Sequence, residues 1–160
     1  MTWPVRFSRW LGRALLPLRC LVCGLPGADG QDLCAACRGD LPWNHPACPT
    51  CALPLPAGPG FRCGRCLRRP PPLDATVAAL AYRFPLDRLL PRFKFHGDLA
   101  AGRLLAELMA TGLARGLAGA PRPGALVPVP LHPARLRQRG YDQALELARP
   151  VAAALGVPLR

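Results

Sequence analysis

The stretch from Cys20 to Cys66 reads CLVCGLPGADGQDLCAACRGDLPWNHPACPTCALPLPAGPGFRCGRC, and it contains all eight cysteines of the chain. They form four Cys-x-x-Cys pairs: Cys20/Cys23, Cys34/Cys37, Cys48/Cys51 and Cys63/Cys66. A tight turn within such a pair brings both thiolates to one point, about 2.3 Å from a shared zinc ion. Two pairs complete one closed tetrahedral site, so the stretch predicts two zinc sites.

The segments between the pairs, residues 24–33, 38–47 and 52–62, all have hairpin length. The simplest arrangement joins neighbouring pairs, so that the first two pairs bind one zinc and the last two bind another. A cross-braced arrangement, first pair with third and second with fourth, stays open from spacing alone. A disulfide framework is an alternative that belongs to secreted chains. Thioredoxin-like chemistry needs one Cys-x-x-Cys pair beside a helix, not four in a loop-rich segment.

The composition changes near Asp74. The preceding stretch, residues 16–72, is rich in Cys, Pro and Gly and poor in periodic aliphatic residues, so metal must supply much of its stability. Beyond Asp74, Ala, Leu and Val dominate in helical patterns. We expect an amphipathic N-terminal helix over residues 1–16, a double zinc ribbon over 17–72 and a second domain over 73–160.

The chain is basic, with a formal net charge of +12 before metal binding. Eight thiolates on two divalent ions would lower this charge to about +8. Such a charge favours phosphate-bearing partners, either a nucleic-acid backbone or a phosphorylated small molecule. No segment approaches the roughly 20 apolar residues that span a bilayer, and arginines interrupt the leader-like run at the N-terminus. We therefore expect a cytoplasmic protein without a transmembrane segment.

The second domain is predicted to contain a parallel sheet. Ala75 to Tyr82 and Ala125 to Val129 have the pattern of buried strands, and Val157 to Leu159 that of the start of another. Helical sequence separates these segments. A strand, helices and a further strand indicate a parallel α/β arrangement with right-handed crossovers.

Two helices are predicted clearly in this domain. Asp98 is a good N-cap for a helix from about Leu99 to Leu117, and a second helix should run from about Tyr141 to Leu155. A shorter helical stretch precedes Asp98, and we expect Pro91 to bend or divide it. Pro150 should likewise kink the last helix.

The loop over residues 128–143 is the predicted ligand site, because ligands collect at the carboxyl ends of parallel strands. Arg135, Arg137 and Arg139 precede Gly140 and a helix N-terminus, an arrangement that favours anions. A solvated basic loop without a ligand is the plain alternative.

Several motifs occur in a fixed order: four Cys-x-x-Cys pairs, a tyrosine-bearing strand, FKFHGD over residues 93–98, VPVPLHP over 127–133 and RQRGYDQ over 137–143. In this combination the chain resembles the competence protein F (ComF) family. Tyr141 and Asp142 replace the phenylalanine and asparagine that are more usual there. The resemblance implies an α/β fold in which a small double zinc ribbon precedes the first part of a type I phosphoribosyltransferase-like parallel-sheet domain, here residues 73–160.

The resemblance also implies a phosphate site, with the pyrophosphate loop at Val129 to Pro133. The family's Asp-Asp-x-x-Thr-Thr-Gly motif, which binds ribose 5-phosphate and supplies acidic residues for Mg²⁺, is absent from this sequence. We therefore read the sequence as a fragment or a truncated product, in which catalysis is doubtful and Mg²⁺ is expected only with the missing C-terminal part. The positions expected to bind phosphate or pyrophosphate are Lys94, Arg137, Arg139, Gly140, Tyr141 and Gln143.

Three functional classes remain from the sequence. The resemblance favours a role in DNA uptake, in which the ribbons bind single-stranded DNA or a competence helicase. The alternative is a metabolic phosphoribosyltransferase that uses phosphoribosyl pyrophosphate and has a structural zinc module. A ribbon adaptor that binds only protein is the third. Arg62, Arg65, Arg68 and Arg69 would contact phosphates, but only Phe61 lies near them as a stacking surface, so base recognition by the ribbon is not expected.

Overall fold

The computed structural model describes residues 18–56, 58 and 60–160. The predicted helix over residues 1–16 lies outside this range. The chain divides into two compact units, Met1–Asp40 and Leu41–Arg160, and one cysteine cluster belongs to each. The domain boundaries predicted near residues 16 and 72 stay predictions.

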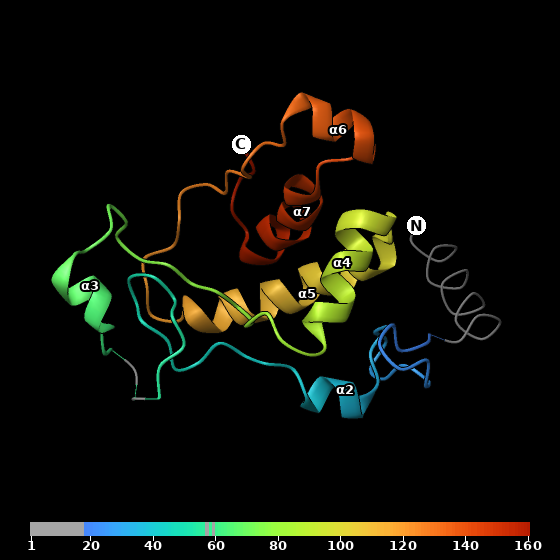
Figure 1. Ribbon diagram of the computed structural model, residues 1–160, viewed down its shortest axis with the longest axis horizontal. Coiled ribbons are helices and arrows are strands. Elements are labelled where there is room, and N and C mark those ends of the chain that lie inside the picture. Colours follow the sequence, from blue (N-terminus) through green and yellow to red (C-terminus); the bar gives the residue numbers. More distant parts are fainter. Residues whose placement is uncertain (1–17, 57, 59) are drawn as a thin grey trace, which may run out of the picture. The chain divides into compact units, whose positions relative to one another are not determined.

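The described part of the first unit is built around its cysteines. A single antiparallel bridge joins Arg19 to Pro26, and the short helix α2 covers Ala35–Gly39 (Figure 1). Leu33 is fully buried, and the other buried side chains of this part are Cys20, Cys34 and Cys37. So small an apolar interior cannot hold a fold without a cross-link or a metal.

The second unit begins with another cysteine-rich segment. It has an antiparallel bridge between Ala47 and Pro54 and the short helix α3, Gly64–Arg68. The predicted strand at residues 75–82 is not a strand of a sheet. Its one bridge is antiparallel, from Leu80 to Trp43, and the N–H of Asn44 donates to the carbonyl of Ala79 at 3.1 Å. This segment therefore pairs with the ribbon and not with the later predicted strands.

Three helices form the core of the second unit: α4, Leu86–His96; α5, Leu99–Gly116; and α7, Gln143–Leu155. Helix α5 packs against both α4 and α7 (Figure 1). The side chain of Phe93 is completely buried and lies over Gly102, where an added Cβ would come 2.5 Å from the ring. Gly102 therefore allows the close approach of α4 and α5.

Both long helices begin after an aspartate cap, of which only Asp98 was predicted. Asp98 caps α5, because its carboxylate accepts from the N–H of Ala101 at 2.9 Å. Asp142 caps α7, so that helix begins at Gln143 rather than at Tyr141. Pro91 does not divide α4, which continues through it. Buried side chains before and after the proline pack the apolar face of the helix and hold both parts together.

The parallel sheet of the predicted α/β fold is not confirmed. Among the described residues there are only isolated bridges, and one of them, from Leu126 to Leu159, is parallel. The N–H of Leu126 donates to Pro158 at 2.9 Å, and the N–H of Arg160 donates back to Leu126 at 3.0 Å. Proline lacks the N–H that a ladder needs, and Pro128, Pro130 and Pro158 interrupt both segments.

Helix α6, like the short helices α2 and α3, was not predicted. It covers Pro133–Arg139, within the loop expected over residues 128–143. Its local signals are Pro133 at the first helical position and the imidazole of His132, which accepts from the N–H of Ala134 at 3.3 Å.

The described helices are all too short or too polar to cross a membrane.

Candidate functional site: two cysteine clusters and a basic surface

The first cluster lies in the first unit and combines the first two Cys-x-x-Cys pairs. All four Sγ atoms lie within 4.8 Å of one another, and those of Cys23 and Cys34 are 3.6 Å apart. Sulfurs at the corners of a zinc tetrahedron are separated by about 3.8 Å, given the usual Zn–S length. Disulfide sulfurs would be about 2.05 Å apart. The cluster thus has the spacing of a metal site, and its cysteines are free thiols.

The second cluster has the same geometry in the second unit. Its four Sγ atoms also lie within 4.8 Å of one another, with 3.7 Å between those of Cys51 and Cys63. Each cluster therefore joins neighbouring pairs. The sequential arrangement is confirmed, and the cross-braced and disulfide alternatives are wrong.

The two clusters are structural repeats. The bridge between Arg19 and Pro26 recurs 28 residues later between Ala47 and Pro54. The third cysteine of each cluster precedes a five-residue helix, α2 or α3. The nearly equal intervals between the pairs are the signal of this repeat in the sequence.

The thiols of the first cluster have contrasting acidities. Burial opposes ionisation of Cys20, but hydrogen bonds from the backbone N–H groups of Cys34, Cys23 and Val22 outweigh it and lower the pKa of Cys20 to about 6. Burial raises the pKa of Cys37, and the neighbouring thiols and the charge on Cys20 raise it further. One thiolate thus forms readily, and its negative charge opposes ionisation of its neighbours.

The second cluster repeats this contrast. A hydrogen bond from the backbone N–H of Cys63 lowers the pKa of Cys48 to about 6. Burial, followed by contacts with the other thiols, raises the pKa of Cys66 to about 12. A divalent cation would offset the repulsion among four thiolates, and four soft sulfur ligands in a closed site are the set that structural zinc prefers.

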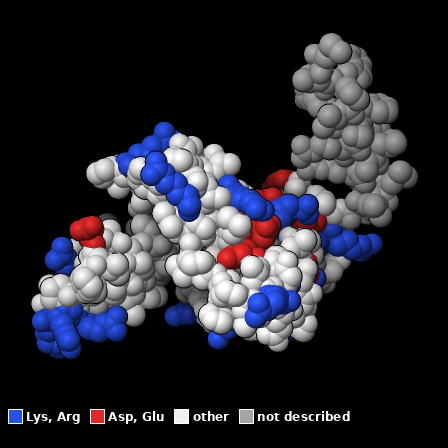
Figure 2. Space-filling model, turned by 90° about the horizontal axis from the view of Figure 1, so that it is seen from above, with Lys and Arg blue, Asp and Glu red and all other residues white. Residues whose placement is uncertain are grey.

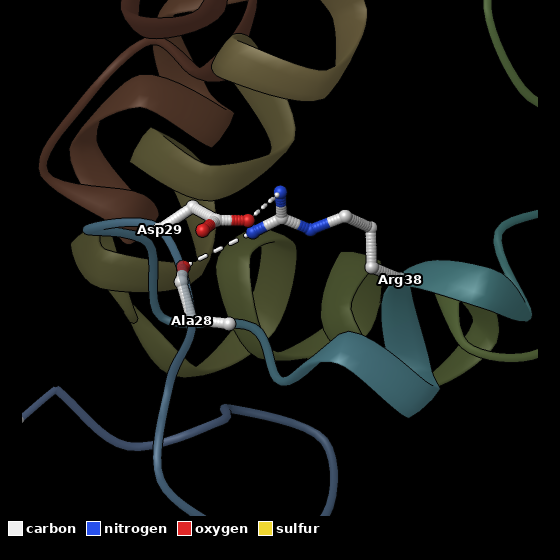
Figure 3. Close-up of polar contacts among 3 residues, drawn as sticks. All are labelled: Ala28, Asp29 and Arg38. Carbon is white, nitrogen blue, oxygen red and sulfur yellow. Dashed lines mark hydrogen bonds and ion pairs between the residues drawn. The ribbon is translucent and has the colours of Figure 1, made fainter.

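The first cluster is stabilised by the guanidinium of Arg38. Figure 3 shows that this group donates to the carboxylate of Asp29 at 2.8 Å and to the carbonyl of Ala28 at 3.0 Å. Arg19 also bonds within the unit, to the carbonyl of Gly24 at 3.3 Å. The arginines of residues 18–40 are thus engaged in holding the turns of the ribbon.

The arginines of the second ribbon are not engaged in this way. Among the described residues the guanidinium groups of Arg62, Arg65, Arg68 and Arg69 have no hydrogen-bond or carboxylate partner, and all four residues are exposed. Figure 2 shows a group of basic side chains over the part of the second unit that contains α3 (left in the view). Leu67, which corresponds in the repeat to Arg38, is 68% exposed between these cations. The second ribbon therefore presents free positive charge.

Residues predicted to bind phosphate lie where α4 meets α7. The amide of Gln143 is buried; it accepts from the guanidinium of Arg139 at 2.8 Å and donates to the carbonyl of Lys94 at 3.4 Å. The hydroxyl of Tyr141 donates to the carbonyl of Phe93. Gln143 and Tyr141 thus connect the start of α7 to the end of α4, and this role was not predicted.

The other two predicted phosphate residues lie on or next to α6. Gly140 ends this helix in a left-handed conformation, with φ of 78°, which suits glycine. Arg137 is exposed in its last turn. The structure thus brings the side chains of Arg139, Tyr141 and Gln143 to the backbone of Phe93 and Lys94, while phosphate binding by all six residues stays a prediction.

The double zinc ribbon domain family matches residues 11–67, a segment that includes all eight cysteines. With the geometry of the two clusters, this match gives the chain two zinc sites of four cysteines each, Cys20/Cys23/Cys34/Cys37 and Cys48/Cys51/Cys63/Cys66.

Comparison with curated proteins gives longer matches. The chain is 35% identical over 145 residues to the DNA utilization protein YhgH of Salmonella typhi, a match that covers 88% of this chain and 63% of the relative. YhgH of Escherichia coli strain K12 is 31% identical over 140 residues, 86% of this chain and 61% of the relative. Competence protein F of Haemophilus influenzae is 32% identical over 143 residues, 88% of this chain and 62% of the relative. The chain thus spans less than two thirds of the length of these relatives, and no solved structure matches it.

Proposed function

This chain is homologous to competence protein F and the DNA utilization proteins YhgH, and from this relationship we propose that it acts in DNA uptake or utilization by binding single-stranded DNA through its second zinc ribbon. The observation that carries the proposal is the group of four unpartnered arginines, Arg62, Arg65, Arg68 and Arg69, defined here as the α3 basic surface.

The charge distribution supports a polyanionic partner. Guanidinium groups without carboxylate partners are available to phosphate oxygens, and they release the counterions of a nucleic-acid backbone when they bind. The zinc site beneath α3 would hold this short helix in place, because Cys63 and Cys66 at its start are ligands of that site. The zinc therefore has a structural role in the proposal.

Salt dependence of binding tests the proposal. Labelled oligothymidylate is titrated with the holo chain at several salt concentrations, and anisotropy is measured. We expect Arg65→Gln/Arg68→Gln to weaken binding and to reduce the slope of log K against log salt by about 1.4, which corresponds to two phosphate contacts with a single strand. The matched control is Arg83→Gln/Arg88→Gln, which removes the same charge from exposed positions outside the surface.

Equal losses for the two variants would contradict a localised surface. If the wild-type chain did not bind the oligonucleotide at low salt, the proposed function would fail. Retention of a protein partner under that condition, such as a competence helicase, would favour the adaptor alternative.

A second proposal concerns residues 73–160, as the first part of a phosphoribosyltransferase-like domain. It is supported by the contacts of buried Gln143 with the guanidinium of Arg139 and with the backbone carbonyl of Lys94, and Arg137 is nearby in sequence. The proposed ligand is phosphoribosyl pyrophosphate or another phosphate compound, with Mg²⁺ and turnover depending on further sequence that supplies acidic residues. Calorimetric titration with phosphoribosyl pyrophosphate, with and without Mg²⁺, tests it. Binding that Lys94→Gln abolishes would support this alternative, and equal heats for the two proteins would contradict it.

The place of action proposed is the cytoplasm, where thiols stay reduced and available to zinc. Fractionation of cells that express the chain tests this proposal, since recovery in the membrane or exported fraction would contradict it.

A further inference from the structure

An aromatic ring on α4 is exposed beside a fixed guanidinium. Phe95 is 68% exposed, although aromatic side chains of this size usually contribute to a core. The guanidinium carbon of Arg139 lies 5.4 Å from the centre of the ring. Phe95 and Arg139 thus form a pair of planar groups at the surface, defined here as the Phe95 platform.

The position of Arg139 is held by buried contacts. Its guanidinium donates to Gln143 at 2.8 Å, and Gln143, only 6% exposed, donates in turn to the carbonyl of Lys94 at 3.4 Å. Tyr141 packs on the fully buried Phe93 with 5.6 Å between ring centres. The platform is therefore supported by the interface of α4 with α7, and little conformational freedom of Arg139 would be lost on binding a ligand.

Exposed cations next to Phe95 and Arg139 in the sequence favour an anionic partner. Lys94 and Arg137 are exposed and have no carboxylate partner within the described part of the chain. The nearest acidic side chains along the sequence are already engaged. Asp98 is paired with Arg92 at 2.6 Å, and Asp142 accepts from the N–H groups of Leu131 and Leu145.

From this arrangement we propose that the Phe95 platform stacks one base of single-stranded DNA, while Lys94 and Arg137 contact the adjoining phosphates. A free phosphate does not stack on an aromatic ring. An unpaired base stacks on aromatic and guanidinium planes, and it has a phosphate on each side along the strand. The inference rests on the proposed function but concerns a different surface, on α4 and α6 and not on α3. The inference assigns base stacking to the Phe95 platform and phosphate contacts alone to the α3 basic surface.

Two oligonucleotides of equal length and charge provide the test, one of thymidine and one with abasic residues. The holo chain should bind the thymidine strand more tightly. We expect Phe95→Ala to weaken that binding by about 5- to 100-fold, as for the loss of one stacked base, with little effect on the abasic strand. Phe95→Trp should preserve the preference for bases, which a purely structural role of the ring would not predict.

Tyr82→Ala is the matched control, because Tyr82 is 65% exposed and has no stacked cation in the described structure. It should leave the preference for bases unchanged. Zinc content and helical circular dichroism establish that each variant is folded.

Three results would overturn the inference. Phe95→Ala could bind both strands as wild type does, the wild-type chain could show no preference for bases, or Tyr82→Ala could lose as much affinity as Phe95→Ala. In each case the DNA proposal survives if the α3 variant still has a reduced salt slope. Absence of binding to both strands by the wild-type chain would instead remove the proposed function and this inference together.

Discussion

The two zinc ribbons share one backbone pattern but use their arginines differently. In the first ribbon Arg38 and Arg19 donate to groups within the ribbon, so their charge stabilises turns. At the position that corresponds to Arg38 the second ribbon has the exposed Leu67, and its arginines have no partners among the described residues. The same backbone pattern thus occurs once with arginines that bond within the ribbon and once with a free basic surface.

The ribbons also differ in what surrounds them. The first belongs to a unit that ends at Asp40, and in its described part the buried side chains are three cysteines and Leu33. The second belongs to a unit that also has the helical core around Leu89, Phe93, Leu104 and Val151. The folding of the first unit should therefore depend almost entirely on metal, whereas the second unit should retain its helices when the metal is removed.

Removal of zinc is expected to have the largest effect. Zinc binding supplies about 10–16 kcal/mol of apparent free energy in small zinc-finger peptides. With a chelator, residues 18–40 should lose amide-exchange protection, while α5 and α7 keep theirs. Mass spectrometry of exchanged peptides measures both regions. Loss of protection in the helices together with the first ribbon would break the comparison.

A cavity in the helical core should destabilise the second unit and leave the first ribbon unaffected. Phe93→Ala removes a fully buried ring, and we expect the second unit to lose about 3–5 kcal/mol of unfolding free energy. Urea titration followed by helical circular dichroism measures this loss. The zinc of the first ribbon should remain bound, and Leu33→Ala should instead weaken that site alone. Release of the first zinc by Phe93→Ala would show that the units are coupled.

The helical core and the zinc ribbons should also lose stability at different pH values in acid. A backbone N–H bond from Ala101 and the ion pair with Arg92 outweigh burial and hold the pKa of Asp98 below its usual 3.8. The stabilisation that the Asp98 carboxylate gives is complete at pH values above 3.8, the pKa of the unfolded chain. This stabilisation is lost as the pH falls toward the lower pKa of the folded state. The ribbons should release zinc at higher pH, because thiolates must be deprotonated to bind it.

Asp98→Ala tests the helical part of this difference. It should cost about 1 kcal/mol at neutral pH and less in strong acid. Urea titrations of the chelated chain at both pH values measure the change, and a cost that did not shrink in acid would contradict the role of the carboxylate.

The smallest expected effect concerns one backbone position in each ribbon. Gly24 has φ of 78°, and its counterpart Ala52 has φ of 59°, a left-handed conformation that disfavours a side chain. Gly24→Ala should destabilise the first ribbon by about 1 kcal/mol, since an added Cβ meets no neighbour and only the conformation opposes it. Ala52→Gly should stabilise the second by less than about 1 kcal/mol. Competition with a zinc chelator measures both changes, and effects of the same sign would contradict the equivalence of the two positions.

Much of the metal site was predictable because its geometry is local. Two residues between cysteines determine a knuckle, so the ligands followed from spacing, as did the cap Asp98 from its own side chain. The cap Asp142 was not predicted, although its side chain is an equally local signal. Helix α6 and the repeat of the ribbons also have local signals in the sequence, which are Pro133 at the first helical position and the nearly equal spacing of the cysteine pairs. The predicted sheet is not confirmed beyond one parallel bridge, because apolar runs resemble strands even when prolines remove the donors of a ladder.

By itself the sequence determined the zinc ligands, the basic charge and the start of α5, since each depends on groups within a few residues. Only the tertiary structure decided which cysteine pairs share a metal, which arginines are free, and that Phe95 lies beside Arg139. These depend on contacts between segments distant along the chain, whose energies come from packing and burial that no local pattern records.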